Sequence, residues 1–193
     1  MARFRWSAKL TALAAFCLLA VGAAAGLYFG NVGHIRARDQ SHQVVVPSAL
    51  DGFSRSPSLE QQLGVIAEAQ SAGQAGRGQA SHVVSAAYQR GSSVAGSPAQ
   101  LFTFIGGNLA GARPSASVAN FEQAYPGAKA AEPGPLGGQA ACTPARQSAQ
   151  GVSMCVWFDN DTFGTLVSPT MTSAELAALL VKVRPGIEQP LTR

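Results

Sequence analysis

The hydrophobic pattern of the chain begins with one uninterrupted apolar run, from Leu10 to Gly30, that contains no charged residue. A helix of about 20 residues spans the roughly 30 Å hydrocarbon core of a bilayer. The run therefore predicts a single transmembrane helix over residues 10–30. We expect residues 1–9 to lie in the cytoplasm, residues 31–43 to form a juxtamembrane tether, and residues 44–193 to form an extracytoplasmic domain.

The same run allows a second interpretation, a signal peptide that is cleaved to release a secreted protein. Ala23, Ala24 and Ala25 supply the small residues that signal peptidase requires. The run nevertheless continues through Tyr28 and Phe29, which makes it long for a signal peptide. These two aromatic rings would lie near the outer interface of the bilayer, where such rings are favoured. Length favours the membrane anchor, with secretion after cleavage as the alternative.

Periodicity in the rest of the chain predicts one α+β domain. The expected strands are 44–46, 81–89 and 101–105, followed by three more strands before the last helix. The expected helices begin at Ser58, Ser117 and Thr172, and Pro185-Gly186 ends the last of them. Ser58 and Thr172 are each followed three residues later by Gln or Glu, which is the spacing of a capping box. We therefore predict an antiparallel sheet of about five to six strands with about three helices.

The most specific structural prediction concerns two cysteines. If Gln139–Arg146 and Gly151–Phe158 form a hairpin around a polar turn, a symmetric register places Cys142 directly opposite Cys155. Directly opposed Cα atoms lie about 4.5 to 5.5 Å apart, within or near disulfide reach. The alternative is two free buried thiols in a cytoplasmic domain, and the membrane signal upstream favours the disulfide. Pro144 cannot donate a ladder hydrogen bond, so we expect Gln139–Arg146 to be an edge strand.

A second tight hairpin is expected around Asp159-Asn160-Asp161, whose polar residues favour a turn. Pairing Phe158 with Thr162 would set Trp157 opposite Phe163, on the same face of the sheet as Cys155. We interpret both aromatic rings as core residues. A ligand platform is the alternative, with Trp157, Asp159, Asn160 and Asp161 as candidate contact residues.

Charge restricts the partners that the domain can bind. Five of the 14 Lys and Arg residues flank the apolar run, which leaves nine basic against ten acidic residues from Asp39 onward. A domain with so even a balance lacks the clustered positive charge that nucleic-acid binding requires. The arginines beside the run are better placed to contact lipid head groups. We expect the lipid bilayer as a partner and no nucleic acid.

Motifs that carry catalysis or bind cofactors are absent from the sequence. There is no G-x-S-x-G elbow, no H-E-x-x-H helix, no P-loop and no G-x-G-x-x-G turn. Asp159-Asn160-Asp161 resembles half of a calcium loop, but the closing Glu is missing, so turn chemistry explains it better. We therefore predict no catalytic residue, no cofactor and no metal.

Several short motifs follow one another in the second half of the chain. They are Glu132–Gly138, Cys142, Met154–Trp157, Asp161–Gly164, Ser168–Met171 and Arg184-Pro185. Together they make this half similar to uncharacterised single-pass membrane proteins of actinobacteria. That resemblance implies a bacterial protein with a membrane tether, an extracytoplasmic α+β domain with one disulfide, and no established activity.

These observations leave two functional hypotheses. The first is a membrane-anchored extracytoplasmic module without catalytic activity, which binds a protein of the cell envelope or senses a signal there. The second is an envelope hydrolase or thiol-redox enzyme, which would need an unpaired and reactive thiolate at Cys142 or Cys155. The lack of a reactive set of side chains favours the first hypothesis.

Overall fold

The computed structural model describes residues 41–64, 80–91, 99–110, 113–145 and 151–191. The predicted cytoplasmic segment 1–9, the predicted transmembrane segment 10–30 and most of the predicted tether lie outside these residues. Within the described part of the chain, no helix is both long enough and apolar enough to cross a membrane.

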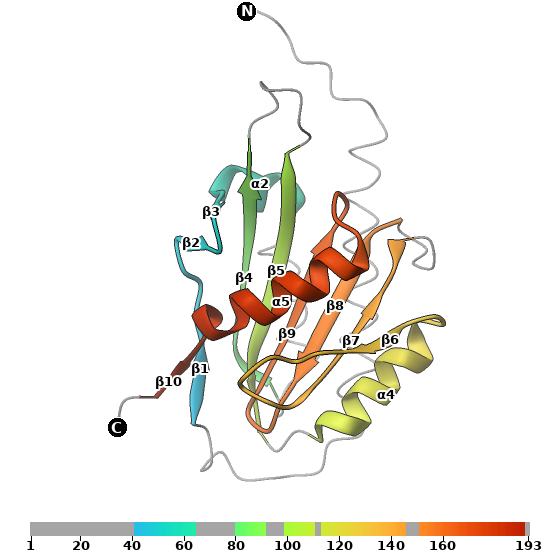
Figure 1. The fold of residues 1–193 in the computed structure, drawn as a ribbon. Coiled ribbons are helices and arrows are strands. Elements are labelled where there is room, and N and C mark those ends of the chain that lie inside the picture. The colour runs from blue at the N-terminus through green and yellow to red at the C-terminus, as the bar shows by residue number, and fades with distance from the viewer. Residues whose placement is uncertain (1–40, 65–79, 92–98, 111–112, 146–150, 192–193) are drawn as a thin grey trace, which may run out of the picture.

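A large antiparallel sheet forms the centre of the molecule. Its strands are β2 (Ala49–Leu50), β3 (Phe53–Arg55), β4 (Ala80–Arg90), β5 (Gln100–Leu109), β6 (Lys129–Ala131), β7 (Gln139–Thr143), β8 (Ser153–Phe158) and β9 (Thr162–Ser168). These eight strands lie in the order β2-β3-β4-β5-β9-β8-β7-β6 (Figure 1). Two further strands, β1 (His42–Val44) and β10 (Glu188–Pro190), form a separate antiparallel ribbon.

The predicted α+β class is confirmed, but the sheet has more strands than the sequence predicts. β2, β3 and β6 are only two or three residues long. Strands this short cannot display an alternating pattern, so periodicity does not reveal them. The predicted strand 44–46 is displaced toward the N-terminus, because Val44 ends β1 and Val45 donates its backbone N–H to Ile187 instead.

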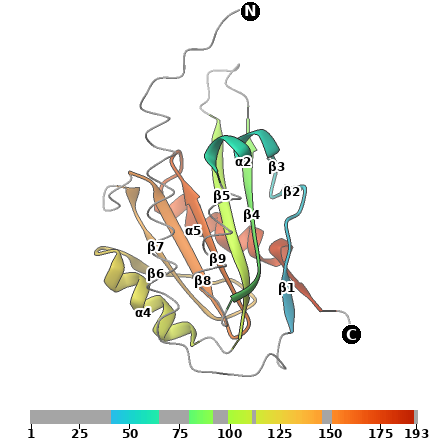
Figure 2. The same cartoon turned by 180° about the vertical axis from the view of Figure 1, so that it is seen from behind.

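The helices cover both faces of the sheet (Figures 1 and 2). They are α2 (Pro57–Leu63), α4 (Pro114–Ala124) and α5 (Ser173–Ile187). α5 crosses one face, where Leu176 and Leu180 pack in the same apolar cluster as Trp157. α2 and α4 lie on the opposite face, where Phe121 of α4 packs in a second cluster with Val156. Strand residues alternate between the two clusters, as the period of two in a pleated strand requires.

The first two helices begin earlier than predicted, because a proline starts each of them. α2 begins at Pro57 rather than Ser58, and α4 begins at Pro114 rather than Ser117. Proline is favoured in the first helical turn, where its missing N–H has no intrahelical partner in any case. Neither helix has a side-chain hydrogen bond at its N-cap, so the predicted serine caps are wrong.

The last helix begins as predicted and ends later than predicted. Thr172 and Glu175 form the reciprocal hydrogen bonds of a capping box, which confirms the predicted start. Pro185 lies inside the final turn, where its side chain is exposed, and the helix continues to the buried Ile187. The helix thus continues past a proline that cannot donate a backbone hydrogen bond, and Ile187 at its end is fully buried.

The β7–β8 hairpin has the predicted register. Cys142 pairs with Cys155, and the same symmetric register pairs Gln139 with Phe158. The prediction of an edge strand is wrong, because β6 pairs with the outer side of β7 and is itself the last strand of the sheet. Pro144 stands one residue beyond the end of β7, where it interrupts no ladder hydrogen bond.

The β8–β9 hairpin is shifted by one residue from the predicted register. Phe158 pairs with Phe163, and Trp157 pairs with Gly164 rather than Phe163. This shift moves Phe163 to the opposite face of the sheet, because side chains alternate along a strand. A side chain at position 164 would collide with the Trp157 ring, so the glycine makes room for that ring.

Candidate functional site

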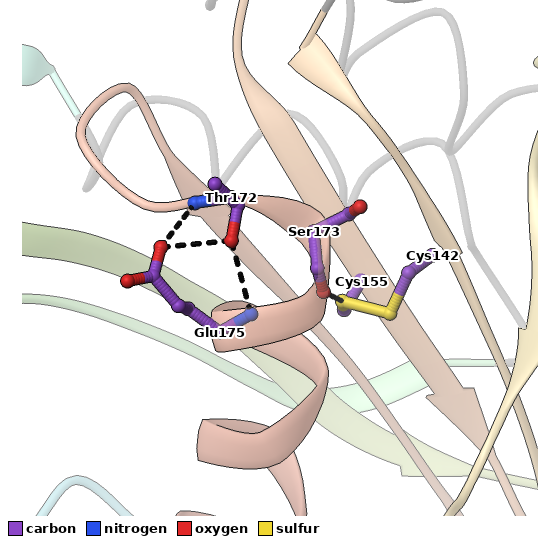
Figure 3. Close-up of a disulfide and its surroundings, with 5 residues drawn as sticks. All are labelled: Cys142, Cys155, Thr172, Ser173 and Glu175. Carbon is purple, nitrogen blue, oxygen red and sulfur yellow. Dashed lines mark hydrogen bonds between the residues drawn. A yellow bond between two sulfur atoms is a disulfide. The ribbon is translucent and has the colours of Figure 1, made fainter.

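Cys142 and Cys155 form a disulfide between neighbouring strands, with an S–S distance of 2.02 Å and Cα atoms 4.1 Å apart. The predicted pairing is confirmed. Both residues are buried beneath the first turn of α5, where the Cys155 sulfur lies 4.0 Å from the carbonyl oxygen of Ser173 (Figure 3). A disulfide sulfur carries no hydrogen, so this is a packing contact. The bond therefore links β7 to β8 directly under the start of α5.

The start of α5 is fixed by its capping box (Figure 3). The Glu175 carboxylate accepts hydrogen bonds from the Thr172 backbone N–H and hydroxyl, both at 2.8 Å. The Thr172 hydroxyl in turn accepts from the Glu175 backbone N–H at 3.2 Å. The hydrogen bonds from Thr172 lower the pKa of Glu175. The start of α5 is therefore held by local hydrogen bonds above the Cys142–Cys155 disulfide. The charged side chain in its first turn, Glu175, is exposed.

A different cluster gathers at the other end of α5, around the β8–β9 turn. Asp159 begins that turn and is buried. Its Oδ1 atom accepts the backbone N–H groups of Asp161 at 3.0 Å and Thr162 at 2.6 Å, while its own N–H donates to the carbonyl of Thr162. These bonds close a turn with only Asn160 and Asp161 at its tip. They explain the shifted register, because closing the turn between Asp159 and Thr162 moves the partner of Phe158 from Thr162 to Phe163.

Arg184 connects this turn to the rest of the fold. It lies in the last turn of α5 and its side chain is fully buried. Its Nη2 atom donates to Asp159 Oδ2 at 2.6 Å, and its Nε atom donates to Glu188 Oε1 at 2.9 Å. Its Nη1 atom donates to the backbone carbonyls of Pro133 and Gly137 at 2.9 Å and 2.5 Å. One guanidinium thereby joins α5, the β8–β9 turn and the loop between β6 and β7.

Glu188 completes the buried cluster at the start of β10. Its Oε1 atom accepts hydrogen bonds from the Trp157 indole N–H and, at 2.8 Å, from the Thr162 hydroxyl. The same hydroxyl lies 3.0 Å from Asp159 Oδ2. Burial and the neighbouring Glu188 raise the pKa of Asp159 to about 6, against the opposing hydrogen bonds and the Arg184 charge. The cluster thus contains two acidic side chains and one basic side chain.

Asp161, in the same turn, holds the first described residues of the chain. Its Oδ2 atom accepts the backbone N–H groups of Ser41 at 2.6 Å and His42 at 2.9 Å, together with the Ser41 hydroxyl at 3.1 Å. Burial opposes ionisation, but these hydrogen bonds prevail and lower the pKa of Asp161. Asn108 contributes from β5 by donating to the His42 carbonyl at 2.6 Å. The carboxylate therefore fixes the point where β1 enters the domain.

The candidate contact residues chosen from the sequence do lie together, but mostly in the interior. Trp157, Asp159 and Asp161 are buried, and Asn160 is exposed at the tip of the turn. The Trp157 ring stacks on Phe104 with centroids 5.8 Å apart. A role in ligand contact stays a prediction for these residues. Asn160 is the member of the set that the solvent reaches.

Sequence reasoning missed Arg184, Glu188 and Thr162. A signal for the arginine is present in the last helix, because Arg184 continues the buried stripe of Leu176 and Leu180 at four-residue spacing. A charge at such a position requires a buried partner. Glu188 stands four residues further along the chain, which is the spacing of an intrahelical ion pair. These two observations together would have identified the pair.

The charged side chains of the cluster around Arg184 form hydrogen bonds with one another. Within the described residues, no group of three or more His, Cys, Asp or Glu side chains is placed to hold a metal ion. Each carboxylate oxygen of Asp159 and Glu188 accepts at least one hydrogen bond from a protein donor. Comparison with protein-family models, curated proteins and solved structures found no match to this chain.

Proposed function

We propose that this chain is a membrane-anchored extracytoplasmic protein whose folded domain binds a partner in the cell envelope or senses a signal there, without catalysing a reaction. The observation that carries the proposal is the buried Cys142–Cys155 disulfide beneath α5. Disulfides persist in oxidising compartments and are rare in the cytosol. The apolar run over residues 10–30 is the membrane signal that would direct the domain to that compartment.

The surroundings of the disulfide favour a structural bond over a redox centre. Redox-active cysteines are accessible and lie in electropositive surroundings. Cys155 is fully buried and packs against Ser173, in the same apolar cluster as Leu176 and Trp157. The other polar cluster, around Arg184, uses its charged groups to satisfy one another. Both arrangements support a scaffold that presents a surface, and they give little support to a thiol-redox enzyme.

The topology can be tested with fusions to the C-terminus of the full chain. Alkaline phosphatase becomes active only outside the cytoplasm, where its disulfides form, and green fluorescent protein exported in an unfolded state stays dark. We expect phosphatase activity and no fluorescence. The reverse pattern would place the domain in the cytoplasm and contradict the proposal. Membrane fractionation of the unfused protein then separates an anchored chain from a secreted one.

The thiol-redox alternative can be tested by labelling cysteines in the full chain with a maleimide under denaturing conditions. We expect only Cys17 to react before reduction, and all three cysteines to react after it. A Cys17→Ala variant serves as the control and should show no reaction until a reductant is added. Reaction of Cys142 or Cys155 in freshly prepared, unreduced protein would favour the enzyme hypothesis instead.

Binding can be tested with a photo-crosslinking residue at Asn160, the exposed tip of the β8–β9 turn, in intact cells. Lys182 on the exposed side of α5 is a second probe position. We expect an adduct with an envelope protein from at least one of the two positions, at a defined mass. Repeated failure to capture any protein from either position, with the domain correctly exported, would count against the binding form of the proposal.

A further inference from the structure

The Thr162 hydroxyl lies between two buried carboxyl groups. Its oxygen is 3.0 Å from Asp159 Oδ2 and 2.8 Å from Glu188 Oε1, and all three residues are buried. A hydroxyl has one hydrogen to donate. If both acids were ionised, Thr162 would satisfy one of these oxygens fully, and the other contact would bring two acceptors together. A proton on one carboxyl group removes that conflict.

The charges of the cluster lead to the same conclusion. Arg184 is the one basic side chain among the described residues that contacts these acids, and it hydrogen-bonds both of them. With both acids ionised, the interior would carry one uncompensated negative charge. Leaving such a charge buried costs several kcal/mol, on the order of a broken buried ion pair. A buried carboxyl group avoids that cost by binding a proton.

We propose that Asp159, Thr162 and Glu188 form a buried proton-binding site. In its filled state Asp159 Oδ2 holds the proton and donates it to Thr162 Oγ1, while Thr162 donates its own hydrogen to Glu188 Oε1. Solvent supplies the proton when the site fills and receives it when the site empties, so no other reactant is involved. The bound proton is then part of the contact between the β8–β9 turn and β10.

The groups around Asp159 explain why Asp159 is the acid that binds the proton. The charged groups that face it are Arg184 from α5, Glu188 from β10 and Asp161 from its own turn. The Nδ1 atom of His42 in β1 lies 3.7 Å from Asp161 Oδ1. Burial and Glu188 raise the pKa of Asp159 to about 6, whereas hydrogen bonds lower the pKa of Asp161. Asp161 therefore stays ionised while Asp159 titrates.

Emptying the site affects the ribbon that joins the two ends of the described chain. Glu188 is the first residue of β10 and pairs with Val44 of β1. Loss of the proton leaves both carboxylates to compete for Arg184 at this junction. We therefore expect β10 to pair less firmly with β1 at high pH than at low pH. The further consequence, a looser connection to a membrane tether, rests on the proposed function, whereas the proton site does not.

The test is a titration of the full-length chain in detergent micelles, with the carboxyl carbons of Asp and Glu labelled with ¹³C. Asp159→Asn identifies the Asp159 signal by its disappearance. We expect that signal to titrate at about pH 6, well above the ordinary Asp value of 3.8. Titration of Asp159 at or below its ordinary value would overturn the proposal, whatever the outcome of the topology experiments.

A matched pair of variants tests the sharing of the proton. Glu188→Gln keeps the shape of the side chain and its acceptor oxygen but removes the second negative charge. We expect it to lower the Asp159 midpoint, because Arg184 then faces a single acid, while the burial that also raises this pKa remains. Glu132→Gln removes an exposed carboxyl group and should leave the midpoint unchanged. An unchanged midpoint in Glu188→Gln would show that the two acids do not share a proton.

Hydrogen exchange of the wild-type chain gives a measurement that does not depend on any variant folding. The backbone N–H groups of Val45 and Leu191 are hydrogen-bonded to Ile187 and Ser41 in and beside the β1–β10 ribbon. After correction for intrinsic exchange rates, we expect their protection to fall several-fold between pH 5 and pH 8. Protection that stays constant across this range would overturn the proposed coupling between the proton and the ribbon.

Discussion

The two ends of α5 are attached to the sheet by different kinds of contact. At its start, the helix lies over the Cys142–Cys155 disulfide and is capped by Thr172 and Glu175. At its end, the buried guanidinium of Arg184 holds two acids and two backbone carbonyls. The first attachment buries no charge, and the second depends on one. One helix thus has an attachment without a buried titratable side chain at its start and an attachment with two buried acids at its end.

The largest effect is expected at the charged end. Arg184→Met removes the guanidinium and leaves two buried acids without their partner, so we expect a loss of about 3–5 kcal/mol in the free energy of unfolding. Denaturant titration of the full chain in detergent measures it. Lys182→Met, two residues away and exposed, removes only a surface contact to Asp51 at 3.7 Å and should change stability by less than about 1 kcal/mol. Similar losses in both variants would contradict the assigned role of Arg184.

A slightly smaller effect is expected at the disulfide end. The bond closes a loop with a sequence separation of 13 residues. Replacing both Cys142 and Cys155 by Ala should therefore lower the free energy of unfolding by about 3 kcal/mol, in the chain-entropy description of a cross-link. The loss should be the same at pH 5 and pH 7, because a disulfide sulfur carries no titrating proton and the buried acids Asp159 and Glu188 lie at the other end of α5. A loss that varied with pH would mean that the two ends of α5 are coupled.

The pH dependence of stability separates the two ends further. The folded pKa of Asp159 is raised to about 6, so its contribution to stability is fully present below the ordinary Asp value and is lost as the pH rises through about 6. The pKa of Asp161 is lowered, so its contribution is present above the ordinary value and is lost on acidification. Stability should therefore decline from pH 4 toward pH 7.

Asp159→Asn should remove that decline while leaving the loss of stability at lower pH, which Asp161 causes. Thermal unfolding at a series of pH values provides the measurement. A decline between pH 4 and pH 7 that is the same size in Asp159→Asn and in the wild type would assign the effect to another group.

The smallest effect is expected at the cap of α5. Thr172→Ala removes the side-chain oxygen that accepts the Glu175 backbone N–H, which should cost about 1 kcal/mol. Thr172→Ser keeps the oxygen and should leave stability nearly unchanged, because Ser is at least as good an N-cap as Thr. Chemical denaturation of the two variants side by side gives the difference. Equal stabilities would show that the disulfide beneath the helix, and not the cap, fixes its first turn.

Local patterns were sufficient to predict some of these features. The register of β7 and β8 follows from a symmetric turn and the alternation of side chains, so Cys142 and Cys155 could be paired from the sequence. The cap of α5 depends only on Thr172 and the residue three positions later. In each case the determining residues are close together in the chain, and their spacing carries the information.

Features that depend on distant residues could not be predicted in the same way. The register of β8 and β9 depends on how the Asp159 side chain closes its turn and on the space that Gly164 leaves for Trp157. The contact of Arg184 with Asp159 depends on a turn that lies 25 residues earlier in the chain. The alternation of apolar and polar residues permits either register of β8 and β9. The apolar periodicity of a helix does not identify the groups that an arginine guanidinium contacts.

If the chain is anchored through its N-terminal side, as proposed, the pairing of β1 with β10 has a mechanical consequence. Force applied ahead of Ser41 reaches the Asp161 carboxylate first, since that group accepts three hydrogen bonds from Ser41 and His42. The load then acts on the paired residues of β1 and β10, from His42–Pro190 to Val44–Glu188. The contacts of these pairs would break one after another. Among the described strands, the three-residue pairing of β1 with β10 therefore receives the load before the eight-stranded sheet does.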